Sequence, residues 1–167
     1  MIIVLNGPLG IGKSTLAEAL MERLEASVML DGDQMIAVNP APAAELDYLH
    51  ATLSLLIRHH QTHGYQHFII NHIWQTADEL SQLRQSLGDL DRDLRCFRLE
   101  LPLEENLRRI RLRQSARAID EQDFEMQTVI DERQALGRSN DTALGEPFDV
   151  SAAPDELVSS LLIRLGL

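Results

Sequence analysis

The sequence has few of the features that would indicate a secreted or membrane-bound protein. Its one cysteine, Cys96, cannot form a disulfide within the chain, so a reducing compartment is the expected setting. No stretch approaches the run of about 18 apolar residues that a transmembrane helix needs. The apolar run at the N-terminus is too short for a signal peptide. We therefore expect a cytoplasmic protein without a membrane partner, in which Cys96 is a buried thiol.

Positive charge is also scarce. Lysine and arginine together number 15 against 26 aspartates and glutamates, which gives a formal net charge of −11 at pH 7. This charge argues against binding to nucleic acid or to anionic membranes, because both are themselves negative. A hydrophobic share of 44% argues against disorder. The length of 167 residues suits one α/β domain over residues 1–167, present as a monomer or a homodimer.

The most specific motif lies at the front of the chain. Residues 7–14 read Gly-Pro-Leu-Gly-Ile-Gly-Lys-Ser and fit the phosphate-binding P-loop pattern G-x-x-x-x-G-K-[ST]. An apolar, β-branched run at residues 2–5 precedes the loop and predicts a buried parallel strand. Leucines at helical spacing follow the loop. Because strand, glycine-rich turn and helix are the context that the motif needs, a chance Lys-Ser after an ordinary turn is the weaker interpretation.

The residue types of this segment explain how it would bind phosphate. Glycines let the backbone approach an anion closely. Successive N–H groups then surround the anion at a helix N-terminus, where the helix dipole also favours negative charge. Lys13 can reach the β- and γ-phosphates of a nucleotide, and Ser14 can ligate Mg²⁺. The predicted nucleotide-binding residues of the loop are Gly7, Leu9, Gly10, Ile11, Gly12, Lys13, Ser14 and Thr15.

Strand and helix patterns alternate along the rest of the chain. Further strands are expected at residues 27–30, 65–70, 94–101 and 148–150, with helical patterns between them and after the last one. Thr76 and Glu79 form a capping box that opens one of the helices. The alternation predicts an α/β fold in which helices cover both faces of a parallel sheet. The spatial order of the strands does not follow from the pattern.

Polar residues follow the second and third expected strands. Asp31 and Asp33 come directly after residues 27–30, and ligands bind where the carboxyl ends of parallel strands meet. We expect both acids near the P-loop, whereas an Asp-Gly turn without function is the alternative. His72 and Trp74 follow the third strand at the same edge, and we expect them to line the pocket of a substrate.

One segment after the fourth expected strand is markedly basic. It contains Arg108, Arg109, Arg111, Arg113 and Arg117. For Arg108 and Arg111 the favoured interpretation is a solvated helix face with salt bridges. Arg113 and Arg117 stand further along, and mobile positive charge of this kind is what phosphoryl transfer needs.

Four segments taken in order resemble a known family. They are GPLGIGKST, VMLDGDQM, LPLEENLRRIRLRQSAR and FDVSAAPDELVSSLL, and they resemble the small-molecule and nucleotide kinases of the P-loop NTPase superfamily, among them shikimate, gluconate and nucleoside monophosphate kinases. The resemblance implies a three-layer fold with a five-stranded parallel sheet of order 2-3-1-4-5 and a short lid at about residues 108–122. It also implies ATP as the phosphoryl donor, Mg²⁺ as cofactor and a small molecule as acceptor.

The resemblance further implies roles for single residues. Lys13 corresponds to the P-loop lysine, and Ser14 and Asp31 correspond to the Mg²⁺ site. Asp33 corresponds to the acid that binds the acceptor hydroxyl, although the two acids could exchange these roles. The lid arginines of such kinases neutralise the transferring phosphoryl group or stack on adenine. The first role is implied for Arg113 and Arg117, and nucleotide binding for Arg109.

The chain also departs from these kinases. Its third strand segment reads Phe68-Ile69-Ile70-Asn71 and lacks the acid that often assists Mg²⁺ there. No glycine triplet or gluconate-kinase signature identifies the acceptor, which stays open among nucleosides, nucleotides, sugars, sugar acids and hydroxylated antibiotics. The alternatives are a P-loop ATPase or regulatory nucleotide-binding protein without a small acceptor, and a protein that binds nucleotide but has lost catalysis. The guanine motif N-K-x-D of GTPases is absent, as is the Walker-B acid pair usual in an AAA-type motor.

Overall fold

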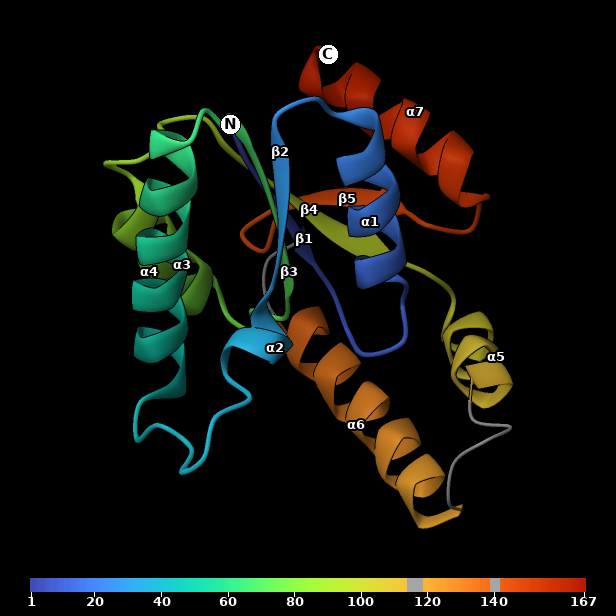
Figure 1. Cartoon of the computed structure of the whole chain (residues 1–167). Helices are drawn as coiled ribbons and strands as arrows, with labels where there is room; N and C mark the ends of the chain where they lie inside the picture. Colours follow the sequence, from blue (N-terminus) through green and yellow to red (C-terminus); the bar gives the residue numbers. More distant parts are fainter. Residues whose placement is uncertain (114–118, 139–141) are drawn as a thin grey trace.

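The computed structural model describes the backbone of residues 1–113, 119–138 and 142–167, and their side chains apart from residues 113 and 119–122. Strands and helices alternate as the sequence predicts (Figure 1). The strands are β1 Ile2–Asn6, β2 Ser27–Asp31, β3 His67–His72, β4 Leu94–Glu100 and β5 Glu146–Asp149. The helices are α1 Lys13–Arg23, α2 Gly32–Met35, α3 Glu45–Thr62, α4 Ala77–Leu87, α5 Leu103–Arg113, α6 Ile119–Gly137 and α7 Pro154–Leu165.

The five strands form one parallel sheet in the order β2-β3-β1-β4-β5. The order 2-3-1-4-5 and the helices on both faces confirm the predicted fold. β1 is the central strand, and side chains alternate across it. Ile3 and Leu5 pack with α1 and α7, whereas Ile2 and Val4 pack with α3 and α4 on the other face. Burial on both faces explains why β1 is a continuous apolar run. Cys96 of β4 is buried as expected, and burial raises the pKa of its thiol to about 12.

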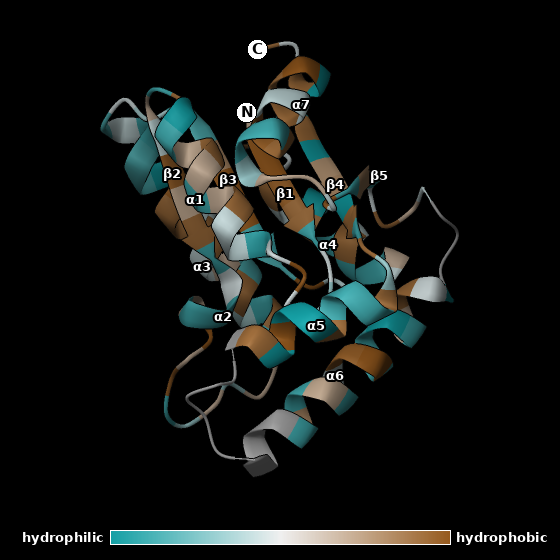
Figure 2. Ribbon diagram, turned by 90° about the vertical axis from the view of Figure 1, so that its right-hand side faces the viewer, coloured by the Kyte–Doolittle hydropathy of each residue, from teal (hydrophilic) through white to brown (hydrophobic). Residues whose placement is uncertain are grey.

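The carboxyl ends of the strands position the candidate site. At the end of β3, Asn71 pairs with Asp31 of β2 on one side and with Leu5 of β1 on the other. The P-loop connects the end of β1 to α1, so it lies at the same edge of the sheet. The pair α5 and α6 extends from this edge, away from the layers that cover the sheet (Figure 1). In Figure 2 the strands are mainly hydrophobic and α5 is mostly hydrophilic.

The third strand begins and ends two residues later than the apolar pattern indicates. β3 covers His67–His72 rather than residues 65–70, because its ladder with β1 continues past the apolar residues to Asn71 and His72. Both polar residues are therefore fixed by the sheet. A four-residue helix that the sequence did not predict, α2, follows Asp31. The Asp31 carboxylate accepts hydrogen bonds from two backbone N–H groups of this helix.

The predicted lid at residues 108–122 covers the end of α5, the start of α6 and residues 114–118, and these last five lie outside the described residues. Within the described part of the chain, no helix combines the length and the apolar character that crossing a membrane requires.

Candidate functional site

The P-loop of this chain has a backbone suited to binding an anion. Gly10 and Gly12 have φ angles of +71° and +109°, which other residues rarely adopt. A Cβ on Gly10 would also collide with Ile110 of α5. The Lys13 ammonium group donates to the carbonyl oxygens of Gly7 at 2.8 Å and Pro8 at 3.1 Å. The Lys13 ammonium group and the N-terminus of α1 thus meet at the phosphate-binding position that the motif predicts.

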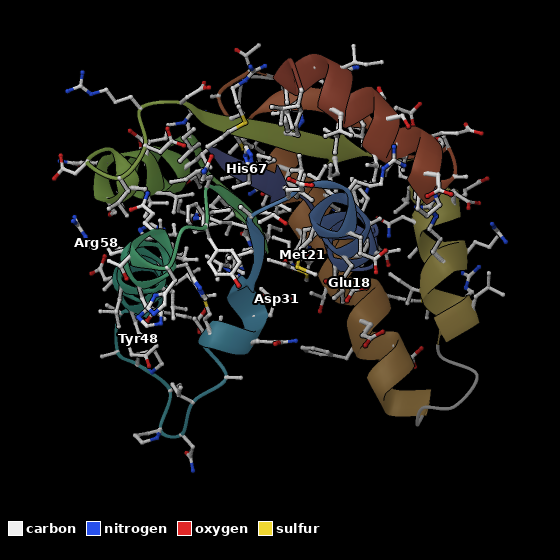
Figure 3. All side chains as sticks on the ribbon, turned by 45° about the horizontal axis from the view of Figure 1, so that its top comes forward. Glu18, Met21, Asp31, Tyr48, Arg58 and His67 are labelled. Carbon is white, nitrogen blue, oxygen red and sulfur yellow. The ribbon has the colours of Figure 1, made fainter. Side chains whose placement is uncertain are left out.

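Three polar side chains from three elements meet beside the loop. Ser14 of α1 donates to Asp31 Oδ2 at 3.3 Å, and the Asn71 amide donates to the same oxygen at 2.9 Å. The Asn71 amide also lies 3.3 Å from Ser14 Oγ. The other Asp31 oxygen accepts from the N–H groups of Asp33 and Gln34 at the start of α2. Figure 3 shows Asp31 where β2 leads into α2. One carboxylate therefore connects Ser14 to the helix that carries Asp33.

This oxygen set fits Mg²⁺, the ion that the fold implies. Mg²⁺ prefers oxygen ligands and is held by one or two protein groups together with phosphates and water. Ser14 Oγ and Asp31 Oδ2 are such groups, and the buried Asn71 Oδ1 has no hydrogen-bond partner among the described atoms. Within the described part of the chain, no group of three or more His, Cys, Asp or Glu side chains has an arrangement that could hold a metal ion by itself. The sequence analysis noted Asn71 at the place where an acid was expected, and in the structure its amide donates to Asp31 from that place.

Asp33 and His72 form a second pair of side chains at this edge of the sheet. The two side chains are linked by a hydrogen bond of 2.8 Å between His72 Nδ1 and Asp33 Oδ1. This bond lowers the pKa of Asp33, with further lowering from the charges of His72 and Lys13. The Asp33 side chain is 64% exposed, whereas His72 is nearly buried. A Cβ on Gly32 would lie 2.7 Å from the His72 ring, so the glycine makes room for this pair.

Trp74 lies behind His72 rather than at a surface. Its side chain is fully buried, and its ring meets the His72 ring edge-on at 5.2 Å between centroids. The indole N–H donates to Nε2 of His50 on α3 at 3.1 Å. The sequence analysis expected Trp74 to line a substrate pocket, whereas the structure places its side chain in the core between the sheet and α3. The residue supports His72 instead.

Arg109 of α5 connects the P-loop to the segment after β5. Its guanidinium group donates to the carbonyl oxygens of Ile11 at 3.1 Å and Val150 at 2.9 Å. A cavity of about 250 Å³ lies here, lined among others by Thr15, Arg109, Leu112, Val150, Ala152 and Pro154. Its walls are mainly apolar, and it opens beside the phosphate-binding residues. Sequence reasoning found Arg109, but it used the segment after β5 only for the family resemblance and gave its residues no role in the site.

The two arginines proposed for catalysis cannot be placed in the site. The Arg113 side chain and the whole of Arg117 lie outside the described residues. Arg108 forms an exposed ion pair with Glu105 at 2.7 Å, as expected for a solvated helix face.

Helix α6 contributes a carboxylate that sequence reasoning missed entirely. Glu132 Oε2 accepts a hydrogen bond of 2.6 Å from the backbone N–H of Leu9 in the P-loop. Burial raises the pKa of Glu132. The Leu9 carbonyl oxygen is held separately, by the Asn106 amide of α5 at 3.1 Å. Nothing in the sequence around Glu132 distinguishes it from the other acids of α6, because its role depends on where the helix lies.

Comparisons with known proteins agree with the fold described above. The AAA_33 family model, described as an AAA domain, matches residues 2–136. A search of curated proteins found no match. The tunicamycin resistance protein of Deinococcus radiodurans has a similar structure, with a TM-score of 0.68 at 20% identity over 99% of this chain and 95% of that one.

Two kinases have similar structures. A gluconokinase from Sinorhizobium meliloti 1021 gives a TM-score of 0.68 at 17% identity over 98% of this chain and 90% of that one. The shikimate kinase of Bacteroides thetaiotaomicron gives 0.63 at 17% identity over 100% and 99%. These similarities confirm the fold that the sequence resemblance implied. The chain therefore belongs to the AAA_33 family of AAA domains and has the fold of the small-molecule P-loop kinases.

Proposed function

We propose that this protein is an ATP-dependent phosphotransferase that moves the γ-phosphoryl group to a hydroxyl group of a small-molecule acceptor. One observation carries the proposal. Lys13 of the P-loop, the group formed by Ser14, Asp31 and Asn71, and the pair of Asp33 and His72 all meet at one edge of the sheet. Donor binding, cation binding and acceptor binding would thus occur side by side.

The donor half of the site binds the nucleotide. The N–H groups of the P-loop surround the phosphates, and Lys13 exchanges its carbonyl partners for phosphate oxygens, where it stabilises the charge of the transition state. The cavity beside Arg109, with its apolar walls, suits the base. Ser14 and Asp31 would hold Mg²⁺, with Asn71 orienting the Asp31 carboxylate, and the ion would neutralise charge on the phosphoryl group.

The acceptor half orients the attacking hydroxyl. Asp33 is kept ionised by its bond to His72, so its carboxylate can accept a hydrogen bond from the acceptor. As the hydroxyl oxygen bonds to the γ-phosphorus and the bond to the β–γ bridging oxygen breaks, the hydroxyl proton passes to Asp33. His72, supported by Trp74, fixes the position of Asp33. Arg113 and Arg117 are proposed to supply lid charge during transfer.

A screen of ATP consumption with and without acceptors tests the proposal. The panel would contain nucleosides, nucleotides, sugars, gluconate, shikimate and tunicamycin, the last three because structural neighbours are named for them. We expect one class of acceptor to raise ATP consumption strongly and to yield a phosphorylated product by mass spectrometry. Hydrolysis at the same rate with and without every acceptor would support an ATPase instead. ATP binding without turnover would support a protein that has lost catalysis.

A further inference from the structure

An anionic side chain already occupies part of the phosphate-binding loop. Glu132 is 123 positions from Leu9 in sequence, yet its carboxylate accepts the Leu9 N–H at 2.6 Å. Lys13, Asp33 and His72 all lie close enough to act on it electrostatically, Lys13 and His72 favouring its charge and Asp33 opposing it. Glu132 thus bonds directly to the phosphate-binding loop, within electrostatic reach of the P-loop lysine and of the Asp33–His72 pair.

The position of Leu9 identifies which phosphate this carboxylate resembles. The Lys13 ammonium group, which in a P-loop reaches the β- and γ-phosphates, donates to the Pro8 carbonyl oxygen next to Leu9. The N–H groups at the start of α1 lie at the opposite end of the loop. The Leu9 N–H therefore belongs to the γ-phosphate end. An anionic oxygen that accepts this N–H beside Lys13 meets the same partners as an oxygen of the γ-phosphate.

The bond is not needed to fix the loop. The Asn106 amide of α5 already holds the Leu9 carbonyl oxygen at 3.1 Å, and the Lys13 ammonium group holds the carbonyl oxygens of Gly7 and Pro8. What Glu132 adds is a negative charge at a position that a triphosphate needs, at the cost of partial burial.

We infer that Glu132 competes with the γ-phosphate for the Leu9 N–H, so that a nucleoside triphosphate displaces it and a nucleoside diphosphate does not. This inference rests on the proposed function, because it gives that site a means of distinguishing its donor from its product. Glu132 would return to Leu9 once the phosphoryl group has left.

Calorimetric titration of the full chain tests the inference. The ligands are Mg-ADP and the Mg complex of the β,γ-imido analogue of ATP, which does not hydrolyse. The variants are Glu132→Gln, which removes the charge and keeps the shape, and Glu132→Ala, which removes the hydrogen-bond acceptor of the Leu9 N–H. Asp131→Asn is the matched control, because Asp131 is exposed on the same helix and bonds only to Gln127 within it among the described contacts.

We expect Glu132→Ala to bind the triphosphate analogue about tenfold more tightly, the equivalent of one hydrogen bond to a charged group. Glu132→Gln should gain less, and ADP affinity should stay the same in both. Equal gains for the two ligands, or weaker binding of the analogue, would overturn the inference. If the wild-type chain binds neither ligand, the proposed function itself fails.

A measurement on the wild-type chain avoids dependence on the variants. The Leu9 amide signal in a ¹⁵N-labelled sample should shift strongly when the triphosphate analogue binds and little when ADP binds. Equal shifts with the two nucleotides would contradict competition at the γ-phosphate end.

Discussion

The proposed donor and acceptor halves of the candidate site are built in different ways. The donor half consists of a short, continuous loop whose backbone would do most of the binding, helped by Lys13. The acceptor half consists of side chains that come from separate elements, namely Asp33 of α2 and His72 of β3, with Trp74 and His50 behind them. The first half depends on local backbone geometry, whereas the second depends on how distant segments pack.

Because of this difference, the two halves are expected to recognise different parts of the substrates. A nest of backbone N–H groups binds a phosphate whatever the rest of the ligand is. A side-chain pair held by a buried tryptophan presents one carboxylate in one orientation, which suits a particular hydroxyl group. Substitutions in the donor half should therefore affect every reaction of the protein, and substitutions in the acceptor half should affect transfer more than nucleotide binding.

The largest effect is expected for Lys13, the only lysine of the chain. Lys13→Ala should lower acceptor-dependent turnover about 10³-fold, because it removes a charge that stabilises the transition state. The fold should survive, since the hydrogen bonds from Lys13 to Gly7 and Pro8 hold the loop, and Lys13 belongs to neither hydrophobic core. The coupled assay measures turnover, and circular dichroism with thermal melting checks the fold. Arg23→Ala, on the exposed end of the same helix, is the control. A folded Lys13→Ala protein with full turnover would refute the mechanism.

Asp33 gives the sharpest test of the division between the halves. Asp33→Asn should lower kcat about 10²-fold or more, since the neutral amide cannot take the acceptor proton. The affinity for the ATP analogue should stay nearly the same, because Asp33 belongs to the acceptor half. Glu18→Gln on α1 is a control for the loss of one exposed negative charge. A large loss of nucleotide affinity with unchanged kcat would place Asp33 in the donor half instead.

The sequence predicts the donor half better than the acceptor half, because the first depends on local backbone geometry and the second on the packing of distant segments. The P-loop is a local motif, and the alternation of strands and helices gives the layers, but the strand order came only from the resemblance. Trp74 was assigned to a pocket because it follows a strand, and packing against α3 buried it instead. Glu132 gave no local signal, and the place of Asn71 at the end of a strand did not reveal its bond to Asp31, because both roles come from contacts with segments far away in the chain.

Asn71 lies between the halves, and its substitution should have an intermediate effect. Asn71→Asp replaces the amide that donates to Asp31 by a second carboxylate about 3 Å from the first. Turnover should fall about tenfold because Asp31 is no longer oriented. Mg²⁺ alone should stabilise this variant more than the wild type, since two carboxylates bind the ion more tightly than one. Thermal melting across a Mg²⁺ titration measures the effect, with Asn71→Ala as the variant that loses the donor without gaining charge; equal stabilisation of wild type and Asn71→Asp would contradict the assignment.

The smallest effect is expected for His50, which accepts a hydrogen bond from Trp74 behind the acceptor half. Burial lowers the pKa of His50, and its Nε2 must be unprotonated to accept the Trp74 N–H. The folded state therefore favours neutral His50, and this contribution to stability is complete above the unfolded pKa of about 6.5 and is lost as the pH falls below it. His60 and His67 also have lowered pKa values and act in the same range. The contribution of His50 is therefore obtained by comparing how the free energy of unfolding changes with pH in the wild type and in His50→Gln. Glutamine keeps a hydrogen-bond acceptor that does not titrate. Urea unfolding should show a smaller loss of stability between pH 7.5 and 5 for His50→Gln than for the wild type. Equal losses in the two proteins would mean that protonation of His50 leaves the acceptor half intact.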